Sequence, residues 1–189
     1  MKRFSVLFGI ALLAIAGIAC AEAQNTAVVL KENFIRRGYN LFFVSVDYDQ
    51  SVEGLVVKGN YDWNFYDWIT RDGKTPSPDF PAAGSGKARV KVYLIHFGRK
   101  MSGKDVLGEL DRMGYKPADI HTLLSLGAKR SELQRKFPIA GLGSAWSPSG
   151  MRSLELVPCL VGNKRTRGVD LRWRWNEWDA ITRFAAVRK

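Results

Sequence analysis

The chain has 189 residues, of which 29 are Lys or Arg and 18 are Asp or Glu, so its formal net charge at pH 7 is +11. Hydrophobic residues make up 46% and aromatic residues 12% of the sequence. This composition is typical of one ordinary globular domain and excludes a chain that is disordered as a whole. Two cysteines are too few for a disulfide framework or a cysteine-rich zinc site.

Residues 1–23 have the pattern of a secretory signal peptide. Lys2 and Arg3 precede the uncharged apolar run Phe4–Ala19, and Ala21-Glu22-Ala23 has the small-x-small form that signal peptidase cleaves. The run is shorter than the about 20 residues that span a bilayer, so we expect cleavage rather than a retained anchor. The mature protein is therefore expected to be periplasmic or secreted and to have no transmembrane helix.

Acylation of Cys20 is the alternative for the amino-terminal region. Gly17 stands where a lipobox normally carries Leu, so a lipoprotein is less favoured than a free exported protein. Cleavage after residue 23 would leave only Cys159 and therefore no internal disulfide, which is unusual in an oxidising compartment.

Residues 24–38 are expected to be a short N-terminal segment, and residues 39–189 a single domain. Polar residues alternate with β-branched and aromatic ones in Tyr39–Asp49 and again from Lys87, which predicts two half-buried strands. Between them, the Pro- and Gly-rich residues 70–86 predict a surface loop. His96 falls on the apolar face of the second run and is interpreted as a hydrogen-bonded histidine of the core or its rim.

Capping residues predict two or three short helices. Residues 51–59, 102–114 and 119–127 each begin with Ser or Asp, continue with apolar residues at helical spacing and end with Gly. His121 lies in the first turn of the third segment, where we expect a solvated or capping side chain.

Short apolar or alternating runs separated by turn residues dominate the last 50 residues and predict a small antiparallel sheet. The runs are FPIAGLGSAW, LELVPCLVG, GVDLRWRW and ITRFAAVRK. The expected fold is therefore α+β, a single domain with short helices packed on small antiparallel sheets.

Catalytic groups are scarce. No nucleophile elbow, phosphate-binding Gly loop, zinc-protease helix or Cys-x-x-Cys spacing occurs. Cys159 lies in LVPCLVG and is interpreted as a small buried hydrophobe. No catalytic residue, metal or cofactor is expected, although carboxylates that meet only in the fold leave glycosidase chemistry open.

Basic residues gather in three parts of the sequence, a pattern that fits a solvated surface and a site for an anionic partner equally well. In DLRWRW, strand periodicity places Asp170, Arg172 and Arg174 on one face and Leu171, Trp173 and Trp175 on the other, which predicts a basic face backed by a tryptophan core. The other two groups lie within residues 99–104 and 129–136. The candidate ligand-binding residues are Lys164, Arg165, Arg167, Arg172, Arg174, Trp175 and Trp178.

Four blocks together resemble a bacterial protein family with no established activity. They are GYKPADIHTLLSLG (Gly114–Gly127), FPIAGLGSAWSP (Phe137–Pro148), VPCL (Val157–Leu160) and RFAAVRK (Arg183–Lys189). The resemblance covers roughly residues 40–189.

The order of these blocks is also distantly similar to the C-type-lectin-like superfold, including its sulfatase-modifying and fibrobacter-type branches. That resemblance implies a binding or scaffold domain. Trp175-Asn176-Glu177 resembles the Trp-Asn-Asp that helps to hold calcium in sugar-binding C-type lectins, but Glu replaces Asp and no Glu-Pro-Asn loop precedes it. Calcium is therefore not expected.

The leading hypothesis is an exported, non-catalytic binding domain that recognises an anionic or glycan-bearing envelope surface. Arg172 and Arg174 would meet acidic groups, while Trp175 and Trp178 would stack on sugar rings. The alternative is an intracellular basic protein that binds nucleic acid or an acidic protein partner. Free Cys159 fits that alternative.

Overall fold

The computed structural model describes residues 40–69, 78–148, 151 and 153–189. The predicted signal peptide at 1–23 and the segment 24–38 lie outside the described residues, as do residues 70–77 of the predicted loop at 70–86. Residues Tyr39–Lys189 group into one compact unit.

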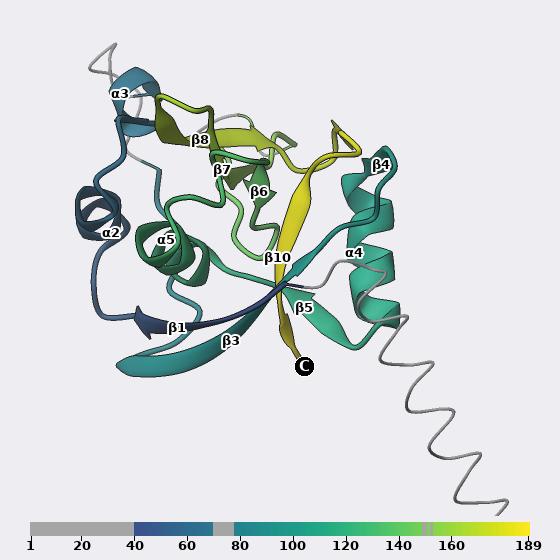
Figure 1. Cartoon of the computed structure of the whole chain (residues 1–189), viewed down its shortest axis with the longest axis horizontal. Coiled ribbons are helices and arrows are strands. Elements are labelled where there is room, and N and C mark those ends of the chain that lie inside the picture. The colour runs from purple at the N-terminus through teal and green to yellow at the C-terminus, as the bar shows by residue number, and fades with distance from the viewer. Residues whose placement is uncertain (1–39, 70–77, 149–150, 152) are drawn as a thin grey trace, which may run out of the picture. The chain divides into compact units, whose positions relative to one another are not determined.

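Helices and strands are both present within that unit, which confirms the predicted α+β class (Figure 1). In chain order they are β1 (Asn40–Asp47), α2 (Val52–Gly59), β2 (Trp63–Asn64), α3 (Tyr66–Ile69), β3 (Lys87–Ile95), β4 (Met101–Ser102), α4 (Gly103–Arg112), β5 (Tyr115–Pro117), α5 (Ile120–Lys129), β6 (Ile139–Ala140), β7 (Leu156–Gly162), β8 (Arg167–Trp173), β9 (Glu177–Trp178) and β10 (Arg183–Arg188). No helix of the described part is long and apolar enough to cross a membrane.

One large sheet has the strand order β1-β3-β10-β6-β7-β8-β2, with β5 paired to the second half of β10, and β4 pairs with β9 separately. The C-terminal runs therefore do not form a small sheet of their own, because β10 inserts between β3 and β6. Its residues Phe184, Ala185 and Ala186 are consecutive and all buried. A strand covered on both faces is typically apolar without alternation, as β10 is.

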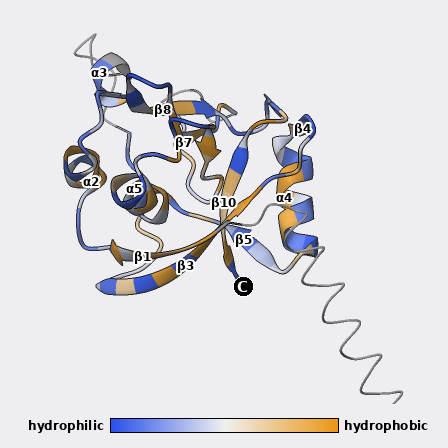
Figure 2. Ribbon diagram, in the orientation of Figure 1, coloured by the Kyte–Doolittle hydropathy of each residue, from blue (hydrophilic) through white to orange (hydrophobic). Residues whose placement is uncertain are grey.

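The sheet separates two cores, between which the side chains of β3 alternate. Val92 and Leu94 pack with buried residues of α2 and α5, whereas Tyr93 and Ile95 pack with α4 and Trp178. Accordingly, α2 and α5 lie on one side of the sheet and α4 on the other (Figure 1). Hydrophobic and hydrophilic residues are mixed along α4, as expected for a helix with one buried face (Figure 2).

The predicted N-caps of α2 and α4 are confirmed. The hydroxyl of Ser51 accepts a hydrogen bond from the Gly54 amide at 3.1 Å, and Ser102 does the same for the Asp105 amide. Gly114 takes a positive φ of 76° just after α4, which favours glycine. After α2, the left-handed residue is Asn60 rather than Gly59, with φ of 49°.

Helix α5 departs from the sequence prediction in two ways. It continues past Gly127 to Lys129, so Gly127 does not end the helix; a Cβ at this position would collide with the Tyr61 hydroxyl and the Leu160 side chain. His121 is buried, not solvated, since its turn packs against residues that precede α2; Nε2 lies 3.2 Å from the Gln50 carbonyl oxygen.

Candidate anion-binding groove

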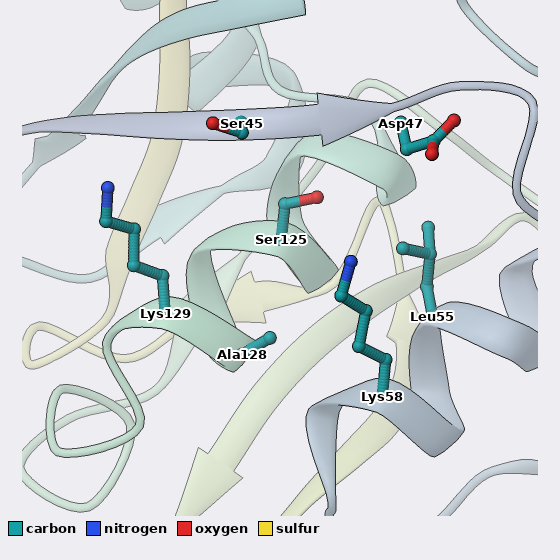
Figure 3. Close-up of a pocket in the computed structure, with 7 residues that line it drawn as sticks. All are labelled: Ser45, Asp47, Leu55, Lys58, Ser125, Ala128 and Lys129. Atoms are coloured by element: carbon teal, nitrogen blue, oxygen red, sulfur yellow. The ribbon is translucent and has the colours of Figure 1, made fainter. Parts of the chain in front are cut away.

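A groove of about 290 Å³ lies beside β1, between that strand and the two helices on the same side of the sheet (Figure 3). Its lining residues are Ser45 and Asp47 of β1, Leu55 and Lys58 of α2, and Ser125, Ala128 and Lys129 of α5. Polar side chains, among them two lysines, therefore line the groove together with the aliphatic side chains of Leu55 and Ala128.

Core packing explains why the two lysines face this groove. Leu55 and Leu124 are buried in the core shared by α2 and α5, which fixes both helices against the sheet. Lys58 and Lys129 lie in the last turns of these helices, where a cation is favoured by the negative end of the helix dipole. Both side chains extend from their helices toward β1 (Figure 3).

The charge of the groove is positive. Lys129 Nζ donates a hydrogen bond to the Phe43 carbonyl oxygen at 2.8 Å, so the ammonium stays at the strand. Asp47 lies 3.6 Å from Lys87, which offsets its charge. Within the part of the chain that the structure describes, no carboxylate forms an ion pair with Lys58. This set of groups is suited to holding a carboxylate, sulfate or phosphate.

More cations lie on the other face of the β1–β3 pair. Lys87, Arg89 and Lys91 are exposed and occupy every second position of β3. The Arg89 guanidinium lies 5.1 Å and Lys91 Nζ 5.7 Å from the centroid of the half-exposed Phe43 ring. Sequence reasoning missed these residues and Lys58, although Lys-x-Arg-x-Lys with a period of two predicts one cationic strand face.

Two of the residues predicted from sequence to bind ligand are buried. Arg167 is 7% exposed, and its guanidinium donates to the carbonyl oxygens of Gly59, Asn60 and Gly127. Trp178 is 4% exposed, packs edge-on against Phe184 and donates from Nε1 to a backbone oxygen. Both side chains therefore stabilise the fold and are removed from the accessible surface.

Carboxylates pair with two further predicted arginines. Arg172 lies 3.4 Å from Asp170, and Arg174 lies 2.9 Å from Glu155, so neither cation is free. The predicted tryptophan core is wrong, because Trp173 is 62% and Trp175 is 48% exposed. The guanidinium of Arg174 lies over the Trp175 ring at 4.9 Å from its centroid.

Lys164 and Arg165 are exposed in the turn between β7 and β8. Arg135 donates to the Lys164 carbonyl oxygen and joins this cationic turn. The turn with Lys164 and Arg165 lies before the first residue of β8, and Trp175 lies after its last residue. Because β8 spans roughly 20 Å, the cationic turn and Trp175 lie at opposite ends of this strand. The predicted residues thus do not form one patch.

Another cationic cavity, of about 550 Å³, lies along α4 and includes Arg99, Lys100 and Lys104. Asp105 and Glu109 line it as well, and Arg112 forms an ion pair with Glu109. Lys100 also pairs with Glu177, so two of the four cations of this cavity form ion pairs, whereas neither lysine of the groove beside β1 forms one among the described residues.

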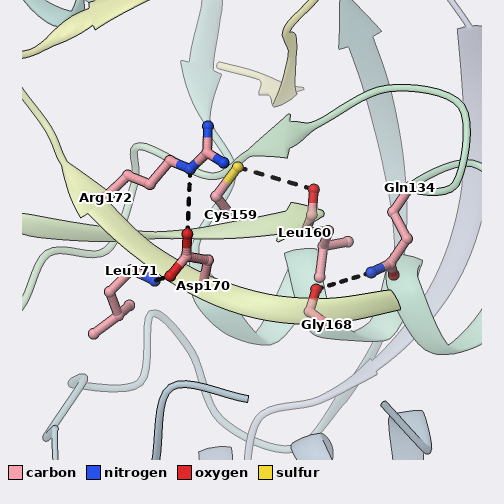
Figure 4. A network of polar contacts seen from close by, with 7 residues as sticks. All are labelled: Gln134, Cys159, Leu160, Gly168, Asp170, Leu171 and Arg172. Atoms are coloured by element: carbon pink, nitrogen blue, oxygen red, sulfur yellow. Dashed lines mark hydrogen bonds and ion pairs between the residues drawn. The ribbon is translucent and has the colours of Figure 1, made fainter. Parts of the chain in front are cut away.

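Cys159 and His96 take the structural positions that the sequence predicts. Burial raises the pKa of the Cys159 thiol to about 12, and the nearby Arg172 lowers it less. The thiol lies near the ion pair of Asp170 and Arg172, while Gln134 donates to the Gly168 carbonyl oxygen of the same sheet (Figure 4). His96 Nε2 lies 2.7 Å from the Ala180 carbonyl oxygen.

Comparison with known proteins gives no match: no protein-family model, no curated protein and no solved structure is similar to this chain. The family resemblances stated from the sequence therefore stay predictions. Among the described residues, no group of three His, Cys, Asp or Glu side chains is placed to hold a metal ion.

Proposed function

We propose that this protein is a non-catalytic binding domain for an anionic partner, and that the partner binds in the groove beside β1. The observation that carries the proposal is the pair Lys58 and Lys129, which reach the same groove from two helices. Ser125 of α5 adds a hydroxyl group at the groove wall, and Ser45 lines the groove from β1. Such a set binds anions through charge-assisted hydrogen bonds.

Phe43 supports the same location from the other face of the strand. Arg89 and Lys91 flank its ring, so an anion with an apolar part would find both kinds of contact there. The signal peptide predicted for residues 1–23 would place this binding in the envelope or outside the cell. An acidic protein or an anionic glycan would then be the available partner.

Charge neutralisation tests the location of the site. We expect Lys58→Gln with Lys129→Gln to weaken binding of polyglutamate or dextran sulfate by about tenfold at low salt, since each lost contact is worth up to about 1 kcal/mol. The control is Lys164→Gln with Arg165→Gln, which removes the same net charge at the turn before β8. Fluorescence anisotropy over a series of salt concentrations measures both.

Equal weakening by the two double variants would show that only net charge matters and would contradict the proposed groove. A third probe, a single-stranded oligonucleotide, distinguishes the proposed function from the alternative of nucleic-acid binding. If it binds more tightly than both other anions and with a steeper salt dependence, the intracellular nucleic-acid hypothesis replaces this proposal.

A further inference from the structure

The free edge of β1 follows from the register of its pairing with β3. The Tyr48 amide donates to the Gly86 carbonyl oxygen at 2.9 Å, in continuation of that register. In an antiparallel pair, alternate residues direct both backbone groups toward the partner strand. The backbone N–H and C=O groups of the even-numbered residues of β1 are therefore directed toward β3. Those of the odd-numbered residues are directed away from it, and these residues are Leu41, Phe43, Ser45 and Asp47.

Lys129 confirms this direction independently, because it reaches the Phe43 carbonyl oxygen from α5. In the described residues, no strand pairs with that side of β1. The outward N–H and C=O groups of Ser45 likewise have no hydrogen-bond partner there. Among the described residues, the outer edge of the eight-residue strand β1 is thus unpaired along the groove, and one of its carbonyl groups is covered by a lysine.

Unpaired strand edges are normally short, charged, bent or covered, since they can pair with other chains. This edge has Leu41 and Phe43 exposed at its start and Ser45 in its middle. Its only covering contact among the described residues is the Lys129 ammonium, and displacing that group requires only side-chain rotation.

We propose that an extended acidic segment of a partner protein adds to β1 as a further strand. This inference rests on the proposed function and names its partner class. A backbone N–H group of the segment would donate a hydrogen bond to the Phe43 carbonyl oxygen in place of Lys129. The released Lys129 ammonium would form an ion pair with a carboxylate of the segment. Alternate side chains would enter the groove toward Lys58, and the others would lie on Phe43.

Charge complementarity selects this occupant over other strands. A second copy of the chain would place Lys58, Lys129, Arg89 and Lys91 beside the same residues of its neighbour, and like charges repel. The sequence segment 24–38 has Lys31, Arg36 and Arg37 against Glu32, so it too has the sign of the groove.

A blocked heptapeptide of alternating Glu and Val is the probe, used with the full mature chain. Two further peptides are N-methylated, one at its odd-numbered residues and the other at its even-numbered residues. Each lacks the backbone N–H groups along one edge of the extended peptide and keeps the charge of the parent. We expect one methylated peptide to bind about tenfold more weakly, because it loses its backbone hydrogen bonds, and the other to bind as the parent does. Isothermal titration calorimetry measures the three affinities.

Variants of the protein test strand addition by changing the edge of β1 instead of the peptide. Ser45→Pro removes an outward N–H at an edge position that tolerates proline, whereas Ser45→Ala keeps it. We expect only the proline variant to weaken peptide binding, with both unfolding at similar urea concentrations. If the proline variant unfolds early, the methylated peptides still decide the question with the wild-type protein.

Equal binding of all three peptides, still weakened by Lys58→Gln and Lys129→Gln, would overturn strand addition and leave the proposed anion site intact. Failure of the parent peptide to bind, with polyglutamate or dextran sulfate retained, would have the same meaning. Loss of every dependence on Lys58 and Lys129 would overturn both. A dimer in sedimentation that Ser45→Pro abolishes would assign the edge to a second copy and overturn the proposal.

Discussion

Arg167 joins three segments that are distant in sequence. Its guanidinium donates to backbone oxygens at the end of α2 and in α5, contacts the Gln134 side chain and lies over the Tyr61 ring. A buried cation is tolerable only when its donors are satisfied, and here backbone carbonyls satisfy them. The same residue type at Arg165, two positions earlier, is exposed.

Cys159 gives a pH dependence at the residue scale. Its thiol has a pKa of about 12 in the folded protein against an ordinary value of 9.0. Above pH 9 the unfolded chain loses this proton and the folded protein keeps it, so the free energy of unfolding falls as pH rises from 9 toward 12. We expect Cys159→Ala to flatten this fall in urea titrations at pH 8, 9 and 10.

An unchanged slope in the alanine variant would contradict that assignment and attribute the fall to other groups. Tyr61 is the main one, since burial raises its pKa above the ordinary value and it titrates in the same direction. Alkylation gives an independent check. Iodoacetamide should leave the native thiol unmodified at pH 8 and modify it in urea.

Two glycines at the scale of the helix make a matched pair. A Cβ at Gly127 in α5 would lie 2.2 Å from the Tyr61 hydroxyl and 2.9 Å from Leu160, whereas a Cβ at Gly108 in α4 meets nothing within 4 Å. We expect Gly127→Ala to destabilise the protein by about 1–3 kcal/mol through overpacking. Gly108→Ala should stabilise it by about 0.5–1 kcal/mol through helix propensity.

Thermal or urea unfolding followed by circular dichroism measures both changes. If both alanine variants are stabilised, the close approach of α5 to Tyr61 and β7 is wrong. If both are destabilised, α4 is less exposed at Gly108 than the structure indicates.

Local elements follow from the sequence, because their causes lie within a few residues. Ser51 and Ser102 cap helices through amides three residues further on, and the alternation in β1 and β3 identifies their buried faces. The placement of β10 between β3 and β6 could not be predicted, since residues far apart in sequence determine it.

The candidate site was beyond sequence reasoning for the same reason. Lys58 is a single cation in its part of the sequence, and Lys129 is distant from it, yet both line one groove. The consecutive basic residues near β8 gave a stronger sequence signal. Burial of Arg167 and ion pairs at Arg172 and Arg174 reduce their availability, and these are tertiary effects.

At the scale of the whole molecule, a net charge of +11 attracts anions generally but selects no site. Exposed charges farther apart than about 8 Å are largely screened at physiological salt, so local groups of cations decide where an anion rests. Beside β1, cations approach from α2, α5 and β3, and no strand in the described part of the chain pairs with the outer edge of β1. That combination distinguishes the groove from the turn at Lys164 and from the cavity along α4.

Amide-resolved mapping of the bound anion would locate its site on the protein. Nuclear magnetic resonance of residues 24–189 with polyglutamate would report which backbone amides shift and which exchange more slowly. We expect the largest changes on Phe43 and Ser45 of β1 and on the last turns of α2 and α5. Changes confined to residues 163–178, or spread evenly over all basic surfaces, would contradict this expectation.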